Sequence, residues 1–138
     1  MVLFSFGENL KIVHSIHLHV HRFHVLKIAY PPFDPLTGNS TAFNSDIRCV
    51  NNECTRATRA DPSWINGPIP GVNLINPPLK DTVIVPANGY VIIRFTADNP
   101  GYWLLHCHLT NHQNSGMNLV MQEGEIQDMP PTPPNFPM

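Results

Sequence analysis

The sequence predicts an all-β fold, and two observations lead to this prediction. Short runs rich in β-branched and aromatic residues recur along the chain, as in 23–29 and 90–96, and such runs are typical of strands. Turn sequences stand before and after the second of these runs, at Pro86-Ala87-Asn88-Gly89 and Asp98-Asn99-Pro100-Gly101. With 138 residues, the chain has room for one domain with a moderate core.

Each predicted strand follows from a local run of β-forming residues. In chain order the predicted strands are 2–6, 10–13, 16–19, 23–29, 82–85, 90–96, 102–106 and 117–122. Residues 112–116 are predicted to form one helical turn. The segment 30–80 is rich in Pro, Asn and Gly and too long for an ordinary loop, so we expect a functional or covering insertion with a short strand at 72–75.

The C-terminal end has a different composition. The ten residues from Met129 contain five prolines, and proline cannot donate a backbone hydrogen bond to a sheet. We therefore divide the chain into a folded part, 1–129, and an extended Pro-rich tail, 130–138.

Composition argues against two classes of partner. Charged residues make up 13% of the chain and the net charge is −2, so the sequence has no basic patch for nucleic acid and no charge run for an anionic membrane. No apolar stretch approaches the roughly 18 to 20 residues of a membrane span. The apolar start, 1–6, lacks the basic residues and the length of a signal peptide.

The residues that carry chemistry lie in two clusters about ninety positions apart. One is His106-Cys107-His108, followed by His112 and Met117, and the other is His14-Ser15-Ile16-His17-Leu18-His19. Thiolate, imidazole and a weak thioether are the ligands of a blue copper centre, which takes two histidines. Metal binding is therefore the chemistry that these residue types indicate.

Strand geometry divides these residues into two groups. Successive side chains of a strand point to opposite faces, so His106 and His108 share one face and Cys107 points to the other. We therefore expect two sites, one on each side, joined by a short covalent path through Cys107. The first group is His14, Cys107, His112 and Met117, and the second is His17, His19, His106 and His108.

The two motifs, HSIHLH and HCHLTNHQNSGM, resemble the C-terminal copper motifs of multicopper oxidases, which include laccases, ascorbate oxidases and ferroxidases. The segment 99–137 is especially similar to animal laccases. The resemblance implies a cupredoxin-like Greek-key sandwich, here a partial plastocyanin-like domain. It also implies type 1 copper ligands His14, Cys107 and His112 with Met117 axial, a type 2 ligand His17, and type 3 ligands His19, His106 and His108.

The function implied by the resemblance is a laccase-like oxidation. Diphenols or related aromatics would lose one electron at a time to type 1 copper, and dioxygen would be reduced to water at a trinuclear cluster. A ferroxidase is the close alternative, although it would need carboxylates near His112, where Gln113 and Asn114 are neutral. A non-catalytic copper-binding fragment is the other alternative.

The resemblance also shows that ligands are missing. The trinuclear cluster of this family uses eight histidines, of which this chain matches four. We expect the others from N-terminal cupredoxin domains of the same or another chain, so that this chain alone is inactive. Only 2–6 and 10–13 can precede the first motif as strands, so we expect the first strands of the sandwich to be absent and the isolated segment to have low stability.

Two residues depart from the usual family motif. Ser15 and Val20 stand where many members have Pro and Gly, and Val20 disfavours the positive φ that Gly allows. His21 and His24 remain unassigned to copper, and we expect structural or supporting roles for them. Asp98 and Glu123 could deliver protons to oxygen, but an exposed turn acid is the commoner case, and neither is assigned.

Cys49 and Cys54 are close enough in sequence for a disulfide that closes a small loop. A zinc pair lacks partner ligands, and two unpaired thiols remain an alternative. A disulfide would fit a secreted, extracellular protein. The sequon Asn39-Ser40-Thr41 points weakly in the same direction.

Overall fold

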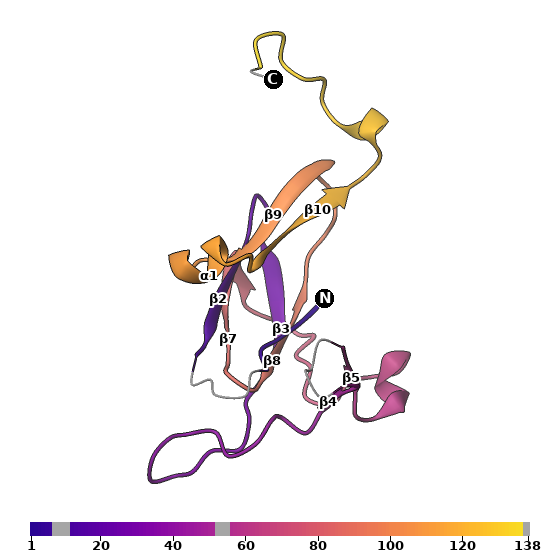
Figure 1. The fold of residues 1–138 in the computed structure, drawn as a ribbon. Coiled ribbons are helices and arrows are strands. Elements are labelled where there is room, and N and C mark those ends of the chain that lie inside the picture. The colour runs from indigo at the N-terminus through magenta and orange to yellow at the C-terminus, as the bar shows by residue number, and fades with distance from the viewer. Residues whose placement is uncertain (7–11, 52–55, 137–138) are drawn as a thin grey trace.

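Two antiparallel four-stranded sheets face each other in the computed structural model, which describes residues 1–6, 12–51 and 56–136 (Figure 1). The strands are β1 (Val2–Phe4), β2 (His14–Leu18), β3 (Phe23–Ala29), β4 (Ile47–Cys49), β5 (Ala57–Arg59), β6 (Leu79–Lys80), β7 (Thr82–Val85), β8 (Tyr90–Arg94), β9 (Gly101–Cys107) and β10 (Asn118–Glu123). The helices are α1 (Thr110–Asn114) and the 3₁₀ turns η1 (Pro62–Ile65) and η2 (Ile126–Asp128). The all-β prediction is confirmed.

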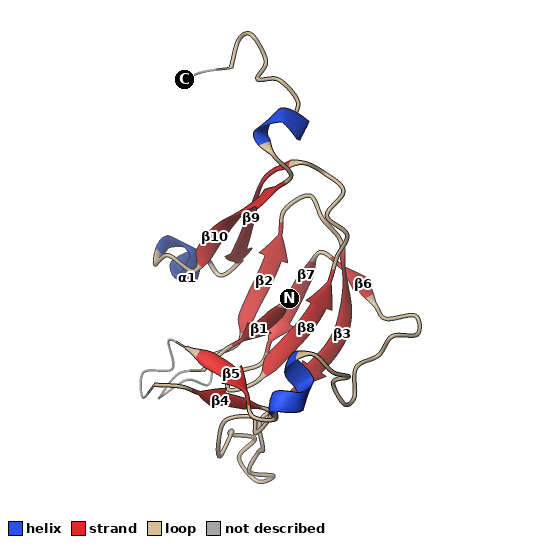
Figure 2. Ribbon diagram, turned by 90° about the vertical axis from the view of Figure 1, so that its right-hand side faces the viewer, coloured by secondary structure: helices blue, strands red, loops and turns tan. Residues whose placement is uncertain are grey.

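The strand order brings distant segments together. One sheet has the order β1-β8-β3-β6, the other β10-β9-β2-β7, and β4 and β5 form a separate pair. Figure 2 shows the strands in red, with the few helical turns outside the sheets. In the second sheet β2 lies between β7 and β9, so the first histidine motif is the direct neighbour of the second.

The core lies between the inner faces of the two sheets. From the second sheet it contains Ile16, Leu18, Val83, Val85, Leu105 and Cys107, and from the first Phe23, Val25, Val91 and Ile93. Phe23, Leu18 and Cys107 are fully buried. This packing holds β2 and β9 in place, because removing apolar surface from water is the main favourable term in folding.

A second apolar cluster covers the outer face of the first sheet. Leu26 follows the core residue Val25 in β3, so it points away from the main core, toward Tyr90 and Ile92. Partly buried side chains of the 30–80 segment, among them Ile47, pack against it. This segment therefore acts as a cover, although it forms the pair β4–β5 and the turn η1 rather than the predicted short strand.

That short strand, 72–75, was predicted wrongly. The Asn73 side chain accepts a hydrogen bond from the amide of Ile75, which closes a local turn. The strand in this region is β6, which pairs with Phe23 and His24 of β3.

Other boundaries also differ from the prediction, and two of them have a clear physical reason. Residues 12–13 are not a strand and 10–11 lie outside the described residues; the ladder of β2 begins at the pair His14–Val85, where Pro86 interrupts the partner strand. The helical turn is two residues earlier than predicted, because Gly116 takes a φ of 93° and ends it.

Residues beyond β10 leave the body of the sandwich. After η2, the described part of the Pro-rich tail extends away from both sheets (Figure 1). Among the described residues, no helix has the length and apolar character needed to cross a membrane.

Candidate metal centre

Three ligand groups of the first histidine–cysteine set meet at one end of the second sheet. His14 is the first residue of β2, Cys107 is the last of β9, and His112 lies in α1. Because Cys107 pairs with Ile16, His14 lies two residues along on the same face. The nitrogens His14 Nδ1 and His112 Nδ1 are 3.1 Å apart, and Cys107 Sγ lies 3.8 Å from the first and 3.6 Å from the second.

This triangle has the dimensions of a metal site. Ligand bonds of about 2.0–2.3 Å around one ion give edges of about 3.5–3.8 Å in a planar triangle, close to those observed. A trigonal set of two histidines and one cysteine is the arrangement of blue copper sites. Burial, and then the neighbouring His112, lower the pKa of His14, which favours the neutral imidazole that binds metal.

Met117 lies beside this triangle. Its carbonyl accepts a hydrogen bond from the amide of Cys107 at 3.0 Å, and its own amide donates to the carbonyl of His112 at 3.0 Å. The backbone therefore ties Met117 to two members of the triangle, and its side chain lines the same cavity as His14 and His112.

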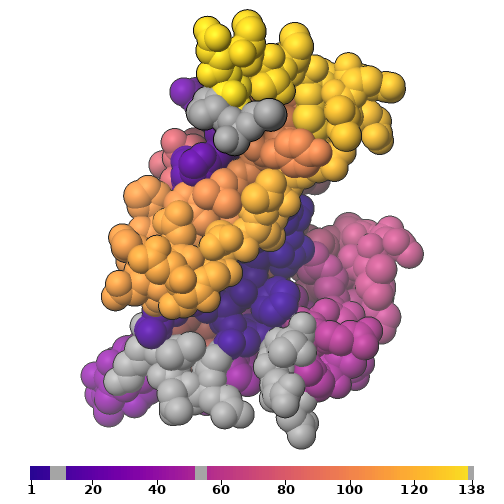
Figure 3. All heavy atoms as spheres, turned by 45° about the horizontal axis from the view of Figure 1, so that its top comes forward, coloured from indigo at the N-terminus to yellow at the C-terminus, as the bar shows by residue number. Residues whose placement is uncertain are grey.

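The cavity beside the triangle has a volume of about 580 Å³. Its described lining is mainly apolar and includes Leu3, Phe4 and Ile12. In the space-filling view the orange residues of α1 and β10 lie next to the indigo N-terminal residues on this side (Figure 3).

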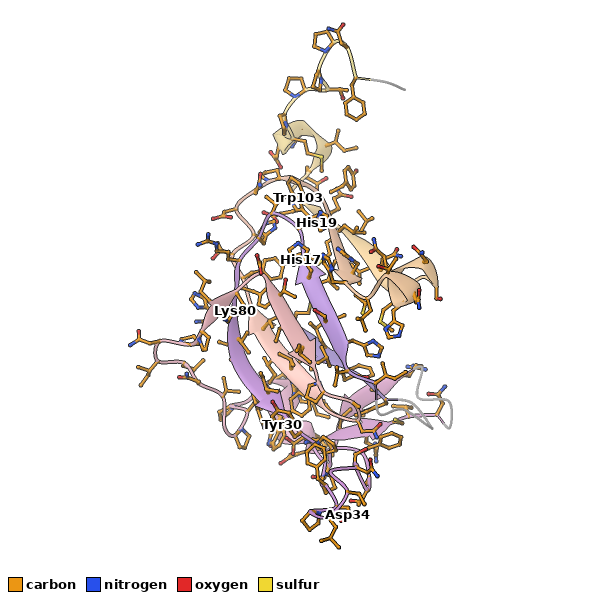
Figure 4. The ribbon with its side chains drawn as sticks, turned by 90° about the vertical axis from the view of Figure 1, so that its left-hand side faces the viewer. His17, His19, Tyr30, Asp34, Lys80 and Trp103 are labelled. Carbon is orange, nitrogen blue, oxygen red and sulfur yellow. The ribbon has the colours of Figure 1, made fainter. Side chains whose placement is uncertain are left out.

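The second set of histidines gathers on the other face of the same sheet. His17 and His106 are paired across β2 and β9, while His19 and His108 follow the ends of these strands. His19 Nε2 lies 3.1 Å from His106 Nε2. The ring centroids are 5.1 Å apart for His17–His19, 5.7 Å for His17–His106, 6.0 Å for His17–His108 and 5.5 Å for His106–His108. Figure 4 shows His17 and His19 close together at one end of β2.

Hydrogen bonds orient two of these rings. His17 Nδ1 lies 2.9 Å from the carbonyl oxygen of Asp81 and 3.0 Å from the hydroxyl of Thr82. His106 Nδ1 donates to the carbonyl of Cys107 at 3.0 Å. In both rings Nε2 is left for a metal, and this use of the second nitrogen is usual for metal-binding histidines. Desolvation and the three neighbouring histidines lower the pKa of His19.

The sequence analysis did not predict that a third set of potential ligand side chains would come together. Ligand atoms of His21, Asp98 and Glu123 lie within 4.8 Å of one another, although 102 positions separate His21 from Glu123. His21 Nε2 lies 2.9 Å from Glu123 Oε2. His24 belongs to none of the three groups, although it lines the same cavity as His21 and Asp98, and its Nδ1 lies 3.3 Å from the carbonyl of Pro77.

Comparisons with known proteins agree with this geometry. The family described as multicopper oxidase matches residues 1–127. The chain belongs to the multicopper oxidase family. Membership of this family implies copper as the metal.

Curated relatives in the multicopper oxidase family are much longer than this chain. Laccase-14 of Oryza sativa subsp. japonica is 46% identical over 69 residues, or 47% of this chain and 12% of that protein. Laccase-14 of Arabidopsis thaliana is 34% identical over 129 residues, or 91% of this chain and 17% of that protein. The chain thus spans between 12% and 17% of the length of these relatives. Both are plant proteins, and the closer resemblance to animal laccases is not supported.

Solved structures of multicopper oxidases share the fold. The laccase from Botrytis aclada is 31% identical, with a TM-score of 0.52 over 82% of this chain and 15% of that one. Fet3p, a multicopper oxidase that functions in iron import, is 27% identical, with a TM-score of 0.54 over 82% of this chain and 17% of that one. The predicted cupredoxin-like sandwich is confirmed.

Proposed function

We propose that this chain supplies one complete type 1 copper site and half of a trinuclear cluster to a laccase-like oxidase. The type 1 ligands are His14, Cys107 and His112, with Met117 axial. His17 is a type 2 ligand, and His19, His106 and His108 are type 3 ligands. Four further histidines come from N-terminal cupredoxin domains of the same or another chain. The observation that supports this proposal best is the triangle of 3.1, 3.6 and 3.8 Å between His14, His112 and Cys107.

Copper bound in these two places supplies one-electron oxidation of a reductant and reduction of dioxygen to water. The residues of the chain hold the two sites on opposite faces of one sheet and link them through a short stretch of β9. Cys107 faces the buried side of the sheet, and its two sequence neighbours, His106 and His108, belong to the other group. Its carbonyl also accepts the hydrogen bond of His106 Nδ1. The path between the sites is therefore short, covalent and held by the backbone.

The cavity favours a diphenol or a related aromatic as the reductant. Its described lining contains no carboxylate, and a site for ferrous iron would need oxygen ligands of that kind near His112. A flat aromatic ring matches an apolar wall next to His112, since it buries apolar surface there. Ferroxidase activity is the less supported alternative, and a non-catalytic copper-binding fragment is the other.

The experiment compares the copper-loaded intact oxidase that contains this chain with its Cys107→Ser variant, using copper content, the visible spectrum and oxygen uptake with a diphenol. The variant is expected to lose the blue absorption, and its oxygen uptake is expected to fall more than about 100-fold. Replacing residues that only support metal ligands lowers affinity or activity by at most about 100-fold, so a larger loss is expected for a ligand. His24→Gln is the matched control, because His24 lies outside both copper groups, and it should keep both signals. Persistent blue absorption in Cys107→Ser would contradict the proposal.

We also propose that the chain works in an oxidising, extracellular compartment and that Cys49 and Cys54 form a disulfide. Cys49 ends β4, whereas Cys54 lies outside the described residues. Two observations support this disulfide: the two cysteines are close in sequence, and disulfides form and persist in secreted proteins. Mass spectrometry after thiol alkylation tests it, and two alkylated cysteines at 49 and 54 in the unreduced protein would refute it.

A further inference from the structure

The turn that carries His19 holds its backbone in an unfavourable conformation. Val20 follows His19 directly and has a φ of 68°, in the left-handed region that a β-branched residue rarely adopts. Its side chain is 62% exposed, so packing of Val20 itself does not offset this strain. Such conformations persist where surrounding contacts hold them, and the next residue provides those contacts.

His21 binds this turn to the rest of the sandwich on three sides. Its Nδ1 donates to the carbonyl of His19 at 3.2 Å. Its ring packs edge-on against Phe95 and Trp103, at centroid distances of 5.5 and 6.0 Å. Its Nε2 lies 2.9 Å from Glu123 Oε2, and the side chains of this pair are only 4% and 10% exposed.

Glu123 connects the turn to the strand that carries His106. It is the last residue of β10, which pairs along its whole length with β9. Its other carboxylate oxygen, Oε1, accepts the amide of Asn99 in the turn before β9. Oε1 of Glu123 is therefore hydrogen-bonded, whereas Oε2 makes a close ion-pair contact with His21 Nε2 that lacks hydrogen-bond geometry. Asp98 beside it is exposed. This arrangement favours a structural contact over a metal site or a proton donor.

We propose that His21 and Glu123 are positioning residues that hold the His19 backbone so that its imidazole meets His106 across the cluster. The inference rests on the proposed function, in which His19 is a cluster ligand. The two ligand nitrogens, His19 Nε2 and His106 Nε2, are 3.1 Å apart. Without the His21–Glu123 contact the strained turn relaxes, and His19 moves away from His106.

The test uses the copper-loaded holoenzyme with Glu123→Ala and the more conservative Glu123→Gln. Each variant is measured for blue absorption, for total copper, and for oxygen uptake. Glu123→Ala is expected to lower cluster copper affinity or oxygen uptake about 10- to 100-fold, the range found for supporting contacts of metal ligands, with the blue absorption unchanged. Glu123→Gln keeps the shape of the side chain and should lose less.

Two further variants separate positioning from other roles. Asp98→Ala removes the exposed carboxylate of the same group and is the matched control, with no expected change. Val20→Gly added to Glu123→Ala should restore most of the activity, because glycine adopts a positive φ without steric strain and the turn then needs no external support.

Four results would overturn the inference. The first is a Glu123→Ala variant with unchanged cluster copper and oxygen uptake, and the second is an equal loss of blue absorption and cluster copper in that variant. The third is no recovery of activity when Val20→Gly is added to Glu123→Ala. The fourth is an equal loss of activity in Asp98→Ala together with zinc bound to the parent protein. The last result would identify a metal site instead. A parent protein without cluster copper would contradict the proposed function itself. This outcome is distinct from the four above, because it is observed in the parent protein without any variant.

Discussion

At the scale of single residues, Cys107 determines how the copper groups are divided. It is buried in the core beside Leu105, while His106 and His108 on either side belong to the group on the other face. This division follows from the alternation of side chains along β9. A shift of the strand by one residue would exchange the two faces, so the register of β9 against β2 is essential to both sites.

The side chain of Asp46 connects the covering segment, residues 30–80, to the first sheet. Its Oδ2 accepts hydrogen bonds from Tyr90 Oη at 2.6 Å and Lys27 Nζ at 3.0 Å, while Lys27 also lies over the Trp64 ring at 5.6 Å. Burial alone would raise the pKa of Asp46, but the hydrogen bonds from Tyr90 and Lys27 outweigh it and lower the pKa below 3.8. Asp46 thus ties the covering segment to the first sheet.

Replacing this carboxylate should destabilise the protein in a pH-dependent way. Asp46→Asn is expected to lower the free energy of unfolding by about 2 kcal/mol at pH 7, since hydrogen bonds to charged groups contribute about 1.5–3 kcal/mol. Because the folded-state pKa is depressed, the contribution is complete above the ordinary value of 3.8 and is lost as the pH falls through the folded-state pKa. Urea unfolding at neutral and acid pH measures both effects.

Asp98→Asn provides the control for this series, because Asp98 is exposed and should change stability little. A difference between Asp46→Asn and the parent protein that stays constant down to the most acid pH would contradict this account.

At the scale of elements, the short helix α1 and the turn after it bring His112 and Met117 to the triangle. The amide of Met117 donates to the carbonyl of His112, and Gly116 between α1 and β10 has a φ of 93°. A side chain at this position would meet no atom within 4 Å. The requirement for glycine is therefore one of backbone conformation and not of space.

Gly116→Ala tests the coupling of this turn to the copper site. A non-glycine residue in the left-handed region costs about 1–2 kcal/mol, so the free energy of unfolding should fall by about that amount. The blue absorption should shift, because the turn connects His112 to Met117. Thermal unfolding and the visible spectrum give the two readouts.

Gly38→Ala is the matched control for this substitution. Gly38 also has a positive φ, of 69°, and also has no atom within 4 Å of an added Cβ, but it lies in the loop near Asp34. It should lose similar stability and keep an unchanged spectrum. Equal spectral changes in both variants would show that Gly116 has no specific connection to the copper site.

At the scale of the whole molecule, the two proposed copper groups differ in how exposed their side chains are. His14, Cys107 and His112 come together within it and form one of the ligand groups found among the described residues. The second group presents exposed imidazoles, those of His19 and His108, on the outer face of the second sheet. That face is where additional ligands would have to approach.

The 138-residue segment expressed alone is therefore expected to bind about one copper with blue absorption, and to show oxygen uptake below about 1% of that of the intact oxidase. The reason is that the proposed type 1 site uses only residues of this sandwich, whereas the proposed cluster takes four more histidines from other domains. Metal analysis and an oxygen electrode measure the two quantities. Four coppers per segment with oxygen uptake would contradict the prediction.

Much of the fold, and the gathering of the histidines and Cys107 into two groups, could be predicted from the sequence, because their signals are local. The strands 23–29 and 82–85 have the predicted bounds, since runs of β-forming residues end there at turn sequences. His106 and Cys107 are adjacent in one strand, and alternation assigns their side chains to opposite faces, while His112 follows only five residues after Cys107 in α1. These features need no knowledge of distant contacts.

Other features were decided only by the tertiary structure. The strand at 72–75 was wrong because an Asn73 turn competes with extended backbone, and the pair β4–β5 was missed inside an irregular segment. The positive φ of Val20 and the contact between His21 and Glu123 could not be predicted. Both features depend on how two segments about a hundred residues apart come together when the apolar faces of β2, β9 and β10 pack. Local sequence preferences carry no information about how these strands pair.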